Sequence, residues 1–245
     1  MRKIFAGKKA LVIGGTGGIG RDITVSLASH GADLVVIGSS NEHANQLRTE
    51  LTRSDTVFQC HVIKLDADNA VNAVLSCCAA PDIVVCAYGP FQRKPLAETT
   101  QDDWRRLVTM NLILPGSLVS AYLGGMIERR WGRILLFGGT NTASIRGWTT
   151  TAPYAAAKTA LGTLAKSVAK NAAVFGVSCN VICPGLTDTI YLDDAARNYN
   201  RKHSPTGTPL HSQDVAAFAL EILKNPHING AVLSIDQGIE LSAVI

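Results

Sequence analysis

The chain has 245 residues, of which 47% are hydrophobic and only 17% are charged. This composition excludes a disordered chain and provides enough apolar surface to cover both faces of one buried parallel sheet. The 23 basic and 19 acidic residues give a net charge of +4, with the basic residues scattered along the sequence. We therefore expect no nucleic-acid partner, because such a surface gathers Lys and Arg on one face.

The six cysteines form no CxxC pair and have no zinc-ligand spacing with histidine, so we expect no metal site. The N-terminus leads directly into a predicted strand, without an apolar leader and cleavage site. No uninterrupted apolar stretch reaches the length of a membrane span. These features predict a cytoplasmic protein with no membrane partner, in which the cysteines stay reduced.

Short apolar runs rich in β-branched residues alternate with segments of helical periodicity along the whole chain. We predict strands at residues 9–13, 33–37, 56–65, 82–86, 133–137, 178–182 and 231–235. This rhythm predicts an α/β fold: a single, doubly wound, Rossmann-type domain over residues 1–245. Its seven-stranded parallel sheet would carry helices on both faces.

Residues 188–209 break this alternation, because they are polar and contain two prolines. They follow a strand at the sheet edge where doubly wound folds bind their ligands. One interpretation is a surface excursion. The other, which we adopt as the prediction, is a substrate-binding lid within the domain.

A glycine-rich turn, GGTGGIG at residues 14–20, follows the first strand and precedes a helix that begins near Arg21. Gly14, Gly18 and Gly20 permit a tight turn and let the backbone approach a pyrophosphate at the helix N-terminus. The spacing is G-x-x-x-G-x-G and not G-x-G-x-x-G. Its place between a first strand and a helix predicts a dinucleotide site.

The second strand ends with the sequence IGSSN, which contains no acidic residue to hold the hydroxyls of an adenosine ribose. The hydroxyls of Ser39 and Ser40 can donate hydrogen bonds to a 2′-phosphate, and Arg21 or His43 could supply positive charge. We therefore predict NADP(H) as the cofactor in preference to NAD(H).

Tyr154 and Lys158 lie in a helix that opens near Pro153, with Thr150 or Thr151 as its possible cap. Residues four apart share one helix face, so the ammonium group lies near the phenol. Free tyrosine has a pKa of about 10, and a neighbouring cation together with the oxidised nicotinamide should lower it. Tyr154 would then exchange a proton with a carbonyl or alcohol oxygen.

The chain resembles the short-chain dehydrogenases/reductases over nearly its whole length, most closely the group that contains 3-oxoacyl-[acyl-carrier-protein] reductases. The resemblance rests on residues 14–20, Asp66 after the third strand, Asn111, Tyr154 with Lys158, NVICPG at 180–185 and IDQG at 235–238. Asn111 also stands out without the resemblance. It continues an apolar helix face, where asparagine needs a hydrogen-bond partner.

The resemblance implies roles by position. Asp66 and Ala67 would contact the adenine, Lys158 would bind the nicotinamide ribose, and Asn111 would hold a water that links Lys158 to solvent. Together with the glycine turn, it gives the predicted cofactor-binding set: Gly14, Thr16, Gly17, Gly18, Ile19, Gly20, Ser39, Ser40, Asp66, Ala67, Ala87, Tyr88, Gly89, Tyr154, Lys158, Pro184, Gly185, Thr187 and Thr189.

Three departures from the family pattern stand out. Cys86-Ala87-Tyr88-Gly89 replaces Asn-Asn-Ala-Gly after the fourth strand, and Ile13 replaces a threonine before the first glycine. The loss of these polar side chains removes local support for the sheet and the site, although Gly89 still permits close approach to the cofactor.

The third departure is a missing serine, which the family places after the fifth strand. Counting along that strand reaches Gly139, whereas counting back about thirteen residues from Tyr154 reaches Asn141, so the loop contains a small insertion. Thr140 lies between them and is predicted to replace the serine, because its hydroxyl has the same hydrogen-bonding capacity. The other candidates are Thr142 and Ser144.

The predicted function is reversible hydride transfer between NADP(H) and a carbonyl or alcohol substrate, with Tyr154, Lys158, Asn111 and Thr140 as catalytic residues. The resemblance implies a 3-oxoacyl thioester, while a small hydrophobic ketone, a sugar or a steroid alcohol stays open. Several basic residues near the site would either meet an acidic acyl carrier or be ordinary surface charges: Arg93, Lys94, Arg197, Arg201 and Lys202.

A second hypothesis is a catalytically weak or inactive dinucleotide-binding protein that acts as a sensor or interaction module. The missing serine favours it, and the retained Tyr154, Lys158 and Asn111 argue against it. The resemblance also implies a homotetramer, in which the helices around Asn111 and Tyr154 and the C-terminal segment to Ile245 pack against partner subunits.

Overall fold

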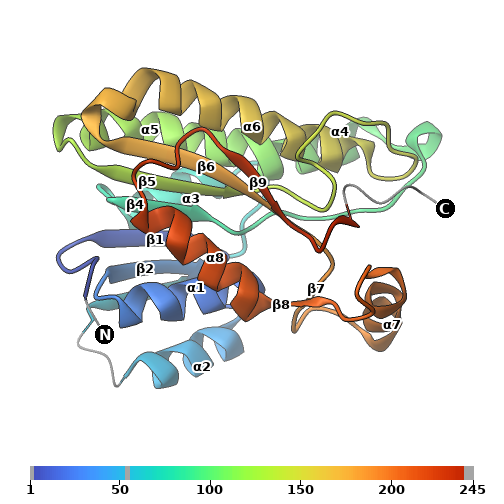
Figure 1. The fold of residues 1–245 in the computed structure, drawn as a ribbon, viewed down its shortest axis with the longest axis horizontal. Helices are drawn as coiled ribbons and strands as arrows, with labels where there is room; N and C mark the ends of the chain where they lie inside the picture. The colour runs from blue at the N-terminus through green and yellow to red at the C-terminus, as the bar shows by residue number, and fades with distance from the viewer. Residues whose placement is uncertain (1–2, 53–55, 240–245) are drawn as a thin grey trace.

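Seven parallel strands form the central sheet of the structure, a computed structural model that describes residues 3–52 and 56–239 (Figure 1). They are β1 (Lys9–Ile13), β2 (Asp33–Gly38), β3 (Phe58–Val62), β4 (Ile83–Cys86), β5 (Gly132–Phe137), β6 (Val177–Pro184) and β9 (Val232–Ile235). Their order is β3-β2-β1-β4-β5-β6-β9, so the chain reverses direction across the sheet between β1 and β4. Ligands of such folds bind at this switch point, beyond the carboxyl ends of the strands. The predicted fold class is confirmed.

Helices cover both faces of the sheet (Figure 1). One layer contains α1 (Gly18–Ser29), α2 (Asn41–Leu51) and α8 (Ser212–Lys224). The other contains α3 (Ala70–Cys77), α4 (Gln101–Val108), α5 (Leu114–Glu128) and α6 (Ala152–Ala172). Short 3₁₀ turns lie at η1 (Leu96–Glu98) and η3 (Ala173–Phe175).

Alternation along β1 explains why both faces need cover. Leu11 and Ile13 pack into the core beneath α5 and α6, whereas Ala10 and Val12 pack into the core beneath α1 and α8. Side chains of a strand alternate between faces, so a strand buried on both sides reads as a continuous apolar run. This is the pattern from which the strands were predicted.

The helical run from α4 to α5 contains a π-helical turn, η2 (Thr109–Ile113), with Asn111 at its centre. Such turns occur often at functional sites. By length and composition alone, residues 101–128 could span a membrane. However, Leu107, Met110, Leu114 and Leu118 are buried in the protein core, as in the core helix of a soluble protein, so the run is weak evidence for a span.

The segment of residues 188–209 contains a helix, α7 (Asp194–His203), that the sequence analysis did not predict. Asp193 caps it by accepting a hydrogen bond from the Ala196 amide at 2.7 Å. The short strands β7 (Thr187–Asp188) and β8 (Leu210–His211) pair at its base, and Arg197 binds the Asp188 carboxylate at 2.5 Å. The segment is therefore a structured excursion beyond the carboxyl end of β6 (Figure 1).

Candidate active site

Two adjoining cavities lie beyond the carboxyl ends of the strands, one of about 350 Å³ and one of about 950 Å³. Ile19, in the first turn of α1, lines both. Of the predicted cofactor-binding residues, the smaller cavity is lined by Gly14, Thr16, Gly17, Gly18, Ile19, Ser39, Ala87, Tyr88, Gly89 and Thr189. The larger is lined by Ile19, Tyr154, Pro184, Gly185 and Thr187.

The glycine-rich turn forms a cradle of bare backbone in the smaller cavity. Gly14 has φ +79°, and a Cβ there would lie 2.7 Å from the Ala87 carbonyl oxygen. A Cβ on Gly20 would collide with the carbonyl oxygen of Gly14. The first turn of α1 has no side-chain cap and no acidic residue, so its amide groups face the cavity without a carboxylate partner. This arrangement fits a pyrophosphate.

Only some of the residues predicted to bind the adenosine end of the cofactor face the smaller cavity. Ser39 lines the smaller cavity, while the Ser40 oxygen caps α2 by accepting from the His43 amide at 3.3 Å. Arg21, a candidate for the 2′-phosphate charge, instead binds Glu50 at 2.5 Å.

Asp66 and Ala67 line a neighbouring cavity of about 540 Å³. One oxygen of Asp66 accepts hydrogen bonds from the amides of Asp68 and Asn69 at 2.9 and 3.0 Å. The Asp66 carboxylate therefore stabilises the turn formed by residues 66–69. Ile63 and Leu65, which the sequence analysis did not name, line the glycine-turn cavity instead.

The buried ammonium of Lys158 is held by the protein backbone. Its Nζ donates a hydrogen bond to the Phe137 carbonyl oxygen at 2.7 Å and lies 5.8 Å from the centre of the Tyr154 ring. Burial lowers the pKa of Lys158 to about 8.

Burial determines the pKa of Tyr154 in the protein without a bound cofactor. Burial of the phenol, with a smaller contribution from Cys183, raises the pKa of Tyr154 to about 12, because desolvation disfavours the charged phenolate. Tyr154 is therefore a protonated hydroxyl at neutral pH in the protein without a bound cofactor. The lowering expected from the sequence depends on Lys158 together with the oxidised nicotinamide, and it stays a prediction.

Asn111 and Lys158 approach each other through the space left by a glycine. A Cβ on Gly89 would collide with Asn111 Oδ1 and lie 3.2 Å from Lys158 Nζ. The Asn111 amide group donates to the carbonyl oxygens of Pro90 and Leu107 at 3.0 and 2.9 Å. Its Oδ1 is buried and has no hydrogen-bond partner, which leaves an acceptor available for a water between Asn111 and Lys158.

Gly139 lies directly against the catalytic candidate Tyr154, because a Cβ there would lie 2.6 Å from the Tyr154 hydroxyl oxygen. The count along β5 therefore identifies the position beside the tyrosine. The count back from Tyr154 is displaced by a turn in which Asn141 has φ +62° and the Thr142 amide donates to Gly139 at 3.1 Å.

Thr140 and Thr142 differ in how their hydroxyls are used. Thr142 is buried, and its hydroxyl group accepts a hydrogen bond from the Gly139 amide at 2.8 Å and donates one to the Gly139 carbonyl oxygen at 2.9 Å. Thr140 lines the larger cavity and donates to the Pro184 carbonyl at 3.1 Å. The lone pairs of Thr140 stay available to a ligand, whereas Thr142 supports the loop.

The family model for short chain dehydrogenases matches residues 8–200 of this chain. The chain belongs to the short chain dehydrogenase family. It is an oxidoreductase of this family, and nothing in the comparisons supports the non-catalytic alternative.

This short chain dehydrogenase has relatives along its full length. It is 28% identical to an uncharacterized oxidoreductase, YvaG, of Bacillus subtilis, over 98% of each chain. It is also 28% identical to the 3-oxoacyl-[acyl-carrier-protein] reductase of Homo sapiens, over 96% of this chain and 98% of the relative. The predicted resemblance to the short-chain dehydrogenases/reductases is thus confirmed, and 3-oxoacyl-[acyl-carrier-protein] reductases are among the relatives.

A similar solved structure is that of a putative NAD(P) dependent gluconate 5-dehydrogenase from Beutenbergia cavernae with bound NADP at low occupancy. It is 26% identical, with a TM-score of 0.85, over 99% of this chain and 100% of that chain. The two proteins therefore share the same overall fold over nearly the whole chain.

The structure also sorts the basic residues that were expected near the site of this short chain dehydrogenase. Lys94 is paired with Asp103 at 2.7 Å and Arg197 with Asp188 at 2.5 Å. Arg201 and Lys202 lie on α7 and do not line the larger cavity, whereas Arg93 does.

Several residues that line the cavities were not found from the sequence. Phe91, Trp148 and Tyr199 line the larger cavity, and Tyr191 lies over the glycine-rich turn, where a Cβ on Gly17 would collide with its hydroxyl. None of them belongs to a periodic element that points to a ligand, apart from Tyr199 in the unpredicted helix α7. Phe91, Tyr191 and Tyr199 are exposed and Trp148 is half-buried, which the sequence does not report.

Proposed function

We propose that this protein catalyses reversible NADP(H)-dependent hydride transfer with a carbonyl or alcohol substrate, in which Tyr154 exchanges a proton with the substrate oxygen. The observation that carries the proposal is the position of Tyr154. Its ring lines the large cavity, one helical turn from the buried Lys158, and this cavity adjoins the bare-backbone cradle at Ile19. The nicotinamide, when bound, supplies or accepts the hydride.

The remaining residues would bind and orient the cofactor. Gly14, Gly18 and the first turn of α1 would hold the pyrophosphate, and Lys158 would bind the nicotinamide ribose, with Asn111 placing a water beside it. Pro184, Gly185, Thr187 and Thr189 would surround the nicotinamide. A protonated Tyr154 can donate its proton to a carbonyl oxygen during reduction.

The proposed cofactor preference is NADP(H). The Beutenbergia relative was solved with NADP. Among the described residues, no Asp or Glu lines the glycine-turn cavity, and Ser39 offers it a hydroxyl. An acidic residue at this position would repel a 2′-phosphate.

We expect kcat/KM for NADPH to exceed that for NADH by about tenfold or more, since charged hydrogen bonds contribute about 1.5–3 kcal/mol. The measurement is absorbance at 340 nm with each reduced cofactor and a ketone panel that contains an acetoacetyl thioester, 5-ketogluconate and neutral aliphatic ketones. Equal kcat/KM for both cofactors would overturn the preference. Cofactor binding without turnover of any ketone would support the sensor hypothesis.

Thr140 is proposed to replace the family's serine. Thr140→Val should lower kcat/KM for ketone reduction about ten- to a hundredfold, as expected for a lost hydrogen bond to the reacting groups. Thr142→Val is the matched control. It should leave kcat/KM near that of the wild type but lower the free energy of unfolding by about 1–2 kcal/mol, because the buried Gly139 amide loses its acceptor. Unchanged turnover in Thr140→Val would refute the assignment.

Three further features are proposed on the same basis. Residues 188–209, with Tyr191 over the glycine turn, form a lid that closes on cofactor and substrate.

The six free cysteines suit a reducing cytoplasm. Exposed Trp104 on α4 and Ile113 before α5 suit a homotetrameric interface along these helices; residues 240–245, also expected there, lie outside the described residues.

The family gives the type of reaction but not the substrate. One candidate is a 3-oxoacyl thioester on an acyl carrier, the substrate that the name of the human relative gives. The larger cavity of about 950 Å³ has room for a small ketone, a sugar or a longer acyl chain.

A further inference from the structure

Arg93 is the one charged side chain among the described residues that line the larger cavity. No Asp or Glu lines it, and within the described part of the chain no carboxylate forms an ion pair with Arg93. The guanidinium carbon lies 5.7 Å from the centre of the Phe91 ring and 5.0 Å from that of Tyr199. Two aromatic rings from different segments therefore hold a cation that the protein itself does not neutralise.

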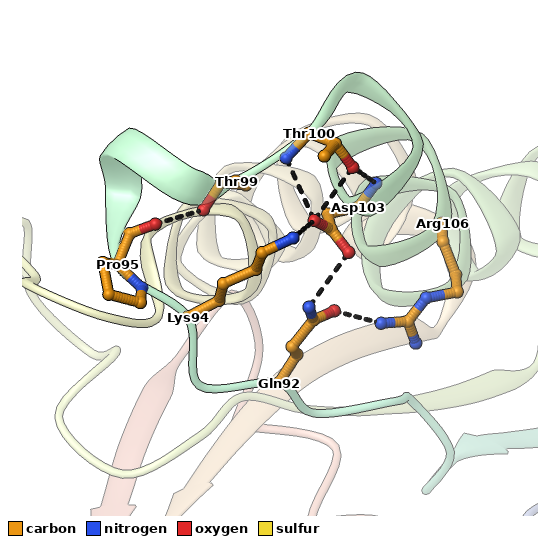
Figure 2. A network of polar contacts seen from close by, with 7 residues as sticks. All are labelled: Gln92, Lys94, Pro95, Thr99, Thr100, Asp103 and Arg106. Carbon is orange, nitrogen blue, oxygen red and sulfur yellow. Dashed lines mark hydrogen bonds and ion pairs between the residues drawn. The ribbon is translucent and has the colours of Figure 1, made fainter.

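The segment that carries Arg93 is anchored to α4 through its neighbours Gln92 and Lys94 (Figure 2). Gln92 and Lys94 bind the two carboxylate oxygens of Asp103 at 2.9 and 2.7 Å. The same carboxylate accepts from the Thr100 amide at 3.0 Å and so closes the capping box of α4. The side chains thus alternate along the segment. Gln92 and Lys94 contact α4, whereas Phe91 and Arg93 line the cavity.

Two further observations show that the anchor is charge-balanced and joined to the cavity wall. The hydrogen bond from Lys94 holds the pKa of Asp103 well below its usual range, so the carboxylate that Lys94 binds stays ionised. The Lys94 amide donates to the Thr150 carbonyl oxygen at 2.6 Å, which ties the segment to the loop that also lines the cavity. Arg93 is therefore the cation of this segment that stays available to a ligand.

One ring separates this cation from the proposed acid. Phe91 packs edge-on against Tyr154, with ring centres 5.0 Å apart and an interplanar angle of 90°. A substrate whose oxygen reaches the Tyr154 hydroxyl would extend along Phe91 to the guanidinium of Arg93.

We propose that Arg93 binds the carboxylate of the substrate, so that the enzyme acts on ketones or secondary alcohols that carry a carboxylate a short chain from the reacting carbon. This inference rests on the proposed function. A guanidinium presents paired donors that match the two oxygens of a carboxylate. A single cation balances one carboxylate. Of the other basic residues near the site, Lys94 and Arg197 are paired with carboxylates, and Arg201 and Lys202 lie on α7 and do not line the cavity.

The test compares oxo acids with their neutral esters. Acetoacetate, levulinate and 5-oxohexanoate, each beside its methyl ester, are reduced with NADPH by the wild type, Arg93→Gln and Arg93→Lys. We expect the wild type to prefer the acids. Arg93→Gln should lower kcat/KM for the acids about ten- to a hundredfold, mainly through KM, and leave the esters within about twofold. Arg93→Lys should recover part of the loss, because it keeps the charge but not the paired donors.

Arg146→Gln is the matched control, because Arg146 is exposed in the loop beside the cavity but does not line it. It removes the same charge and should leave the acid-to-ester ratio unchanged. Equal kcat/KM for acids and esters in the wild type would overturn the role of Arg93 and leave the proposed function intact. An effect of Arg93→Gln confined to carrier-bound thioesters would also overturn it, in favour of a carrier surface.

Calorimetric titration of levulinate into the NADP⁺-loaded protein separates the two proposals where no ketone is turned over. Binding that is lost in Arg93→Gln and kept in Arg146→Gln would support the carboxylate site even if the proposed function fails. The absence of binding, or binding equal in all three proteins, would overturn the site.

Discussion

Tyr154→Phe is expected to abolish ketone reduction, with a loss in kcat of about a thousandfold or more. The substitution keeps the ring and its edge-on contact with Phe91 but removes the hydroxyl that lies beside Gly139 at the cavity. General acid catalysis contributes about 10²–10⁴-fold. Absorbance at 340 nm measures the rate, and fluorescence titration of NADPH should show that cofactor affinity changes little.

Tyr199→Phe is the matched control for this prediction. Tyr199 also lines the larger cavity, and its ring contacts Arg93, but its hydroxyl has no role in the proposed proton transfer. The variant should keep kcat within about threefold of the wild type, as expected for a change that spares the acid. If Tyr154→Phe retained the wild-type rate, the proton donor would have to be another group, and the proposed mechanism would fail.

Gly89→Ala is expected to lower kcat/KM about a hundredfold through steric displacement alone. The added methyl group would collide with Asn111 Oδ1 and lie 3.2 Å from Lys158 Nζ. Neither side chain can give way freely, because Asn111 donates to two carbonyl oxygens and Lys158 to a third. A small displacement of groups that orient substrate and cofactor costs on the order of a hundredfold in rate.

The control for Gly89→Ala is Gly124→Ala on the exposed face of α5, where a Cβ would meet nothing within 4 Å. That variant should keep full activity and gain up to about 1 kcal/mol in the free energy of unfolding, because glycine is a poor helix former. Steady-state kinetics measure the activity of both variants, and thermal unfolding measures their stability. A fully active Gly89→Ala protein would show that the approach of Asn111 and Lys158 is not needed for catalysis.

The sequence by itself determined the sheet, the glycine cradle and the pairing of Tyr154 with Lys158. Each depends on short-range physics. A buried parallel strand must be apolar on both faces, Gly14 occupies a left-handed conformation, and residues four apart share one face of a helix. These constraints act within a few residues, so they can be read without knowing which distant segments meet.

Only the tertiary structure decided the details that depend on segments meeting in space. The turn with Asn141 in a left-handed conformation placed Gly139, and not a hydroxyl, against Tyr154. Burial, which sequence spacing does not report, raises the pKa of Tyr154 in the protein without a bound cofactor. Asp103 anchored Lys94 and left Arg93 free in the cavity, a distinction that two adjacent basic residues in one loop do not show in sequence. Desolvation and cavity lining are properties of the packed chain, because both depend on which surfaces exclude water together.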